Sequence, residues 1–163
     1  MKPLRKAFSL IEVVIAIAVV AGGLTVMLAL LPSLVRNSED AADVHTALRL
    51  PDAVHVALKG EMRGDFASFA NGIQASGLDL VAEKDGSNVR RDDASDNPVR
   101  SRHFLIEVRG FDSGELAYNA GDAVLVMRVK VSWPYRVLSG GTLLPAVEAK
   151  DRQSITFNLA LNP

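Results

Sequence analysis

The sequence contains no cysteine, and this absence excludes disulfides and thiolate-ligated metal sites. Catalytic motifs are also missing, because no HExxH, GxSxG or phosphate-loop pattern occurs anywhere in the chain. There are three histidines, His45, His55 and His103, and we interpret each as a surface or boundary residue rather than a ligand. We therefore expect no enzyme activity, no metal site and no cofactor.

An excess of charge of either sign is equally lacking. The formal net charge is −1, with 18 basic and 19 acidic residues. No stripe of lysine or arginine runs through the sequence, so we expect no nucleic-acid partner. An acidic stretch with Asp92, Asp93 and Asp96 lies between residues 90 and 102. Its spacing matches no established calcium loop, and we interpret it as an exposed, solvated loop.

The sequence has a single long apolar run, and it lies near the N-terminus. Val13 to Leu31 is nineteen residues without a charge. In a helix this run spans about 28 Å, close to the ~30 Å hydrocarbon core of a bilayer. Lys2, Arg5 and Lys6 precede the run, whereas the residues after it carry mixed charge. The positive-inside rule therefore predicts a single-pass inner-membrane protein with a cytoplasmic N-terminus and a periplasmic or extracellular C-terminal domain.

One carboxylate, Glu12, stands at the start of this apolar run. A carboxylate at the bilayer centre costs roughly 2.5 kcal/mol or more, and less near an interface. Three interpretations remain open from the residues alone. The segment is a secretory signal peptide cut after Val19-Val20-Ala21, an uncleaved anchor whose helix dipole favours Glu12, or a segment in which Glu12 meets a specific partner.

The third interpretation comes from a resemblance. Ala7-Phe8-Ser9-Leu10-Ile11-Glu12-Val13 resembles the class III signal of type IV pilins and type II secretion pseudopilins. The resemblance implies cleavage by a prepilin peptidase between Ala7 and Phe8, followed by N-methylation of Phe8. It also implies that Glu12 pairs with the N-terminal amine of a neighbouring subunit and sets the register of assembly. Such a buried pair satisfies a carboxylate that is otherwise costly in an apolar bundle.

Two departures and one further similarity accompany this resemblance. The family usually has glycine where Ala7 stands, and Pro32 lies deeper than the usual family proline. The segments 30–34 and 129–134 are similar to the prepilin-like cassette proteins of Verrucomicrobia, B type. Because the chain has no cysteine, the C-terminal disulfide loop of many pilins cannot form. The resemblance therefore implies a minor pilin or pseudopilin rather than a major adhesive pilin.

The rest of the sequence predicts an α+β domain. A helical pattern continues beyond Pro32 as far as Pro51, and a second helix is predicted from Pro51 to about Gly64, with a short helical piece near residues 66–73. Alternation of apolar and polar residues then predicts an antiparallel sheet with one covered face. Its expected strands are 78–81, 88–90, 104–108, 123–133 and 154–161, with a turn at 139–141.

The resulting expectation is an α+β, pilin-like protein with a long N-terminal helix packed on a C-terminal antiparallel sheet. Residues 1–7 form a basic leader, 8–35 a transmembrane and assembly helix, and 36–163 an extracytoplasmic domain. The expected function is that of a minor pilin or pseudopilin in a type IV pilus-like or type II secretion filament. Its expected partners are the prepilin peptidase, the inner membrane and other pilin or pseudopilin subunits. The alternative is an uncleaved single-pass anchor whose α+β domain binds a soluble partner.

Overall fold

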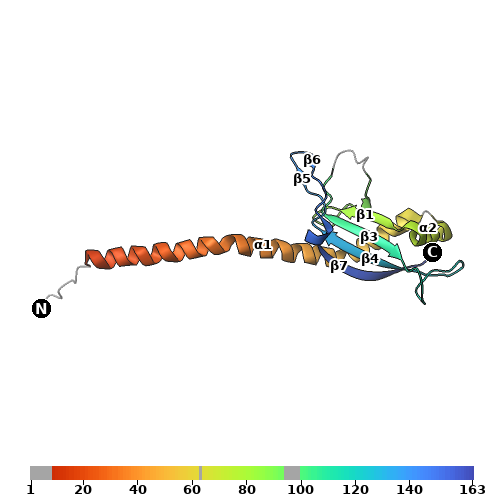
Figure 1. Cartoon of the computed structure of the whole chain (residues 1–163), viewed down its shortest axis with the longest axis horizontal. Helices are drawn as coiled ribbons and strands as arrows, with labels where there is room; N and C mark the ends of the chain where they lie inside the picture. The colour runs from red at the N-terminus through yellow and green to blue at the C-terminus, as the bar shows by residue number, and fades with distance from the viewer. Residues whose placement is uncertain (1–8, 63, 94–99) are drawn as a thin grey trace. The chain divides into compact units, whose positions relative to one another are not determined.

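A computed structural model describes residues 9–62, 64–93 and 100–163 and has α+β architecture (Figure 1). A long helix, α1 (Leu10–Met62), is followed by a short helix, α2 (Phe66–Ser76), and then by an antiparallel sheet. The chain divides into two compact units, Met1–Ala42 and Asp43–Pro163. Helix α1 continues across the boundary between them, so its two parts have different surroundings.

The first part of α1 has no packing partner among the described residues of its own unit. Every described residue up to Ala42 is exposed, and the first buried residue of the helix is Asp43. This part contains the one segment, among the described residues, that is long and apolar enough to cross a membrane. An all-round apolar helix of this kind needs a lipid or protein environment, because water gives it no favourable contact.

The second part of α1 is amphipathic. Ala47, Leu50, Val54 and Leu58 are buried and recur at intervals of three or four residues, which places them on one face of the helix. The sequence predicted that the helix stops at Pro51, and this prediction is wrong because α1 runs through to Met62. A proline removes one helical hydrogen bond. Here the burial of Leu50 and Val54 on either side of it favours the helical path.

The sheet is antiparallel throughout and has the strand order β2-β1-β3-β4-β7. Its strands are β1 (Leu78–Ala82), β2 (Arg90–Arg91), β3 (Phe104–Gly110), β4 (Leu125–Trp133) and β7 (Gln153–Leu161). A separate two-stranded hairpin joins β5 (Leu138–Ser139) to β6 (Thr142–Leu143), and a short 3-10 helix, η1 (Ala149–Asp151), precedes β7. The five predicted strands are therefore present, and each boundary lies within two residues of the predicted one.

Short-range hydrogen bonds define helix α2. Asp65 is its N-cap, and the Asp65 carboxylate accepts a hydrogen bond from the Ser68 backbone N–H at 3.0 Å. This bond holds the pKa of Asp65 below its usual value. The helix ends at Gly77, whose φ of 69° lies in the left-handed region that glycine tolerates. A Cβ at Gly77 would also lie 2.6 Å from the Arg109 side chain. A residue with a side chain would therefore clash at this position.

The hydrophobic core lies on one face of the sheet. The buried face of α1 and residues Ala70 and Ile73 of α2 pack there against the inward residues of β1, β3 and β4. The alternation of β4 is as predicted, since Leu125, Met127 and Val129 are buried while the intervening Arg128 and Lys130 are exposed. The opposite face carries a much smaller apolar cluster of Val81, Leu105 and Tyr135.

The loop between β2 and β3 differs from the sequence prediction. We expected an exposed stretch from residue 90 to residue 102, but Arg102 is only 4% exposed. Its guanidinium forms an ion pair with Asp92 and donates to the backbone carbonyl of Asp93. Asp92 also accepts a hydrogen bond from the Tyr135 hydroxyl at 2.9 Å. Asp92 therefore anchors the end of this loop to the domain, whereas Asp96 lies outside the described residues.

Candidate assembly site at the start of helix α1

Helix α1 begins with a reciprocal pair of hydrogen bonds between Ser9 and Glu12. The backbone N–H of Ser9 donates to Glu12 Oε2 at 3.0 Å, and the backbone N–H of Glu12 donates to Ser9 Oγ at 3.3 Å. This is a capping box, in which residues three apart satisfy each other's unpaired helix-terminal donors. The first turn of α1 is also where the helix dipole favours a negative charge. Glu12 therefore has a local structural role within a single chain.

Sequence reasoning placed Glu12 at the start of the helix but missed this cap. The signal was available, because Ser-x-x-Glu directly before an apolar run is the sequence pattern of a capping box. Only Oε2 of the carboxylate takes part in the cap, and within the described residues Oε1 accepts no hydrogen bond. The cap and an interaction with a second chain are thus chemically compatible. The other two predicted site residues, Ala7 and Phe8, lie outside the described residues.

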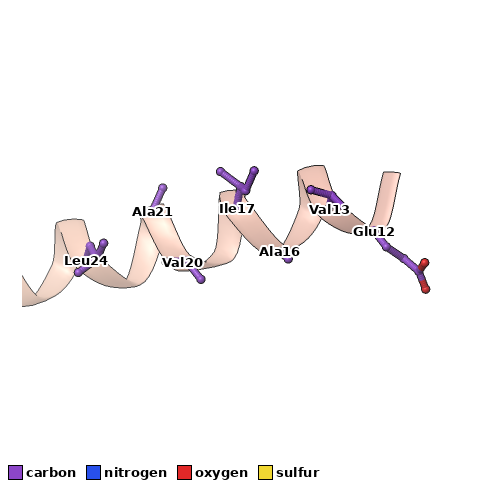
Figure 2. Close-up of a pocket in the computed structure, with 7 residues that line it drawn as sticks. All are labelled: Glu12, Val13, Ala16, Ile17, Val20, Ala21 and Leu24. Atoms are coloured by element: carbon purple, nitrogen blue, oxygen red, sulfur yellow. The ribbon is translucent and has the colours of Figure 1, made fainter. Parts of the chain in front are cut away.

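An apolar helix face adjoins the carboxylate. Figure 2 shows Glu12 at the end of a face that continues along the helix through apolar side chains only. That face is lined by Val13, Ala16, Ile17, Val20, Ala21 and Leu24. Ala16 and Ala21 lie five residues apart. Because their side chains are small, they leave shallow depressions in the helix surface between the larger branched side chains. Small residues of this kind allow a neighbouring helix to approach closely in a membrane.

Polar side chains within the apolar segment satisfy their own hydrogen bonds. Between Glu12 and Arg36 the only hydroxyls are those of Thr25 and Ser33. Thr25 Oγ1 donates to the Ala21 carbonyl at 2.9 Å, and Ser33 Oγ donates to the Leu30 carbonyl at 2.8 Å. An unpaired polar group is costly in hydrocarbon, and these bonds remove that cost. Glu12 is then the one side chain of the segment that needs an external partner or an interface.

A buried polar contact joins α1 to the residue directly before β3 in the second unit. Asp43 Oδ2 lies 2.9 Å from His103 Nε2, and the two residues are each 8% exposed. The His103 ring also packs edge-on against Phe104, with ring centroids 4.8 Å apart. The prediction that every histidine is a surface or boundary residue is therefore wrong for His103. His45 is exposed and His55 is half-buried, as predicted.

The remaining titratable groups were compared with the arrangement that a metal centre requires. Within residues 9–62, 64–93 and 100–163, no group of three or more histidine, aspartate or glutamate side chains is placed to hold a metal ion. The pKa of Tyr135 is raised by burial and by its hydrogen bond to the Asp92 carboxylate, while nearby Arg136 and Arg152 act weakly in the opposite sense. These contacts stabilise the second unit. The start of α1 is the candidate functional site.

Comparison with family models, with curated proteins and with solved structures finds no significant match to this chain. The function is therefore inferred from the residues themselves and from the geometry at the start of α1.

Proposed function

We propose that this protein is a structural subunit, a minor pilin or pseudopilin, of a type IV pilus-like or type II secretion filament. One observation carries the proposal. The Phe8-Ser9-Leu10-Ile11-Glu12 sequence stands directly before an uncharged helical segment whose described residues are all exposed. A carboxylate in the first turn of such a helix, adjoining an apolar face, suits helix-to-helix assembly in which a neighbour supplies the positive charge.

The proposed processing creates the required partner. Cleavage after Ala7 removes Lys2, Arg5 and Lys6 and leaves a free amine on Phe8. Glu12 Oε2 caps the helix, and Oε1 remains available to the Phe8 amine of a neighbouring subunit. A charge-assisted bond of this type offsets the desolvation of both ions only when they meet in register. The pair would therefore select one axial offset between neighbouring helices.

The side of the membrane on which the N-terminus lies is inferred from the distribution of basic residues. Three basic residues precede the apolar segment, and they favour a cytoplasmic N-terminus with the α+β domain on the other side. In this orientation the Ala7–Phe8 bond lies at the cytoplasmic face, where a prepilin peptidase acts in the family that the sequence resembles. The second unit, Asp43–Pro163, is then the part that reaches the periplasm or the cell exterior.

A second candidate function is an uncleaved single-pass anchor that holds the α+β domain at the membrane. It is favoured by the Ser9–Glu12 cap, because the cap gives Glu12 a use that requires no other subunit. In this case Ala7 and Phe8 remain joined, and Glu12 lies at the membrane interface. The two functions differ in the first residue of the mature chain, which is directly measurable.

The deciding experiment is the mass of the N-terminal peptide after the full chain is expressed in membranes together with a prepilin peptidase. A peptide that begins at Phe8, with or without one added methyl group, supports the filament subunit. A start at Met1 or Lys2 favours the anchor, and a start at Gly22 indicates a secreted domain.

An Ala7→Gly variant serves as the matched control for the cleavage step. If the natural chain stays intact while the variant is cut before Phe8, then the signal is functional and Ala7 limits the rate. If neither chain is cut, the filament proposal is wrong.

A further inference from the structure

The hairpin formed by β5 and β6 lies in an uncharged stretch of the chain. Residues 137–147 are eleven positions without a charge, in a chain that is 23% charged. Leu138 pairs with Leu143, and the Leu144 backbone N–H donates to the Val137 carbonyl at 2.9 Å. None of the hairpin side chains belongs to either hydrophobic cluster of the domain. The hairpin is therefore closed by its own backbone and lies outside the core.

The apolar side chains of this hairpin are exposed to solvent. Val137 and Leu144 are each 45% exposed, and Leu138 and Leu143 are half-buried. The turn consists of the two glycines at 140–141, both with a positive φ that residues with a side chain rarely adopt. Figure 1 shows the hairpin standing away from the sheet. Four apolar side chains thus gather on a projecting hairpin, and their transfer to a less polar environment is favourable.

The hairpin begins at the end of the domain where α1 enters it. Arg136 directly precedes the hairpin and forms a β-bridge with Arg102. The residue after Arg102 is His103, whose Nε2 lies 2.9 Å from Asp43 Oδ2. Asp43 is the first α1 residue of the second unit. These contacts place the base of the hairpin beside the point at which α1 joins the domain.

The length of α1 brings a bilayer within reach of this end of the domain. Helix α1 is continuous, and twelve helical steps separate Leu31, the last residue of the uncharged run, from Asp43. At ~1.5 Å per residue these steps span about 18 Å. Headgroups occupy roughly 5–8 Å of this distance, and the hairpin extends about 10 Å from Val137 to Gly140 at ~3.3 Å per residue. With the tilt that is usual for membrane helices, the hairpin is therefore long enough to reach the headgroups.

The other end of the sheet has the opposite character. The loop after β3, residues 111–124, lies at the end of that strand away from His103. This loop contains Asp112, Glu115 and Asp122 and has no basic residue. Carboxylates are costly in a bilayer and are repelled by anionic headgroups. Of the two ends of the sheet, the one with the hairpin is therefore suited to lie against a membrane.

We propose that the hairpin 137–144 inserts its apolar side chains into the headgroup region of the bilayer that holds the first part of α1. The partner of the hairpin is thus a lipid surface. The inference rests on a membrane location of the first part of α1, which both candidate functions share, and it does not depend on cleavage at Ala7. The contact gives the domain a second attachment point and fixes its orientation at the membrane. In a filament subunit, this contact has to break when the subunit leaves the bilayer.

The test uses the absence of natural cysteine, which allows a single thiol to be placed in the full chain. Ser139→Cys places it in the hairpin, and Ser113→Cys, at an equally solvent-exposed serine, places it in the loop at the other end of the sheet. Each form is labelled with an environment-sensitive fluorophore and reconstituted in vesicles of phosphatidylethanolamine and phosphatidylglycerol. Lipids that carry a nitroxide near the headgroup quench fluorophores in contact with the bilayer. We expect the quenching at position 139 to exceed that at position 113 several-fold.

Equal quenching at the two positions, whether strong or weak, would overturn the proposal. A fluorescence shift at position 139 that appears only at high protein density, without quenching by lipid, would also overturn it, because it would identify a second protein chain as the partner. Flotation with the vesicles is measured for both forms. Chains that do not float contradict the membrane location of α1 and this inference with it. Floating chains without quenching at position 139 contradict the hairpin contact alone.

A matched pair of charge variants provides a second measurement. Leu144 in the hairpin and Leu116 in the opposite loop are both 45% exposed, so Leu144→Asp and Leu116→Asp add the same charge at equally exposed positions. Each is introduced into the Ser139→Cys form. Leu144→Asp should lower the quenching at position 139 to the level found at position 113, because a carboxylate is costly in the bilayer. Leu116→Asp should leave it unchanged. The emission of the buried Trp133 reports whether both variants remain folded, and a folded Leu144→Asp form with full quenching would exclude the proposed contact.

Discussion

Asp43 of α1 and His103, the residue directly before β3, form a buried contact across sixty positions of sequence, with 2.9 Å between Asp43 Oδ2 and His103 Nε2. Asp43 is the first residue of α1 that is buried, and it is also the first residue of the second unit. The contact therefore marks the place at which the helix becomes part of the folded domain. Each partner is desolvated, so each depends on the other for its hydrogen bond.

Replacing Asp43 should measure the value of this contact. Asp43→Ala leaves His103 buried without its partner, and we expect a loss of about 1–3 kcal/mol in the free energy of unfolding. Asp43→Asn retains an acceptor of similar shape and should lose less. The single tryptophan, Trp133, is 2% exposed and provides the fluorescence signal for denaturant unfolding. Equal stabilities for the two variants would show that hydrogen bonding is not what Asp43 contributes.

Glu12 has two separable properties, its hydrogen-bonding capacity and its charge. Glu12→Gln retains a side-chain acceptor for the Ser9 N–H and removes only the charge, whereas Glu12→Leu removes both. If the filament proposal holds, both variants should insert in the membrane and both should be incorporated poorly into filaments. The measurement is the fraction of tagged variant that co-purifies with sheared filaments, relative to the unchanged chain. Normal incorporation of Glu12→Gln would show that the cap, not the charge, is the property that matters.

Two leucines of α1 provide a matched pair for testing the core. Leu50 is 1% exposed and Leu48 is 62% exposed, although they lie two residues apart on the same helix. Leu50→Ala should lower the free energy of unfolding by about 2–5 kcal/mol, because it leaves a cavity against the sheet. Leu48→Ala should change it by less than about 0.5 kcal/mol. Denaturant unfolding of both variants in micelles decides the matter, and similar losses would contradict the assigned helix face.

Tyr135 should make stability depend on pH in the alkaline range. Its pKa is raised in the folded protein, so the fold retains a proton that the unfolded chain releases near the ordinary value of 10.0. The stabilisation is therefore complete below that value and is lost as the pH rises through the folded pKa. Tyr135→Phe cannot ionise and should lose less stability over the same rise in pH. The check is a tyrosinate absorbance titration of both proteins, with unfolding measured at each pH.

The pattern of alternating residues was sufficient to predict the sheet, whereas single residues with strong local preferences were misleading. Val124 to Trp133 alternates clearly, and its inward residues are buried, although the outward Ser132 near the end of the strand is buried too. Pro51 predicted a helix end because local propensity disfavours proline there, but packing on both sides overrides that preference. The partners of Asp43 and Asp92 were not predictable, because the contacts join residues 60 and 43 positions apart in the chain. Only the topology of the folded domain brings them together.

The candidate site was accessible to sequence reasoning in one respect and not in another. The position of Glu12 next to an apolar run is evident from the residues, and the Ser-x-x-Glu pattern that forms the cap is also visible in the sequence. The place of the hairpin 137–144 could not be recognised in the same way. Its lack of charge is visible in the sequence, but only the folded domain brings its base beside Asp43, through the contacts of Arg102 and His103.

The exposure of every described residue in the first part of α1 has a genetic consequence. The core of the domain takes its α1 contribution from Ala47 onwards, so changes in residues 9–42 leave that core intact. A random-mutation screen confined to this segment would therefore return few variants that fail to fold. The variants that lose function would instead map the contacts that the segment makes with lipid or with other chains, one helix face at a time.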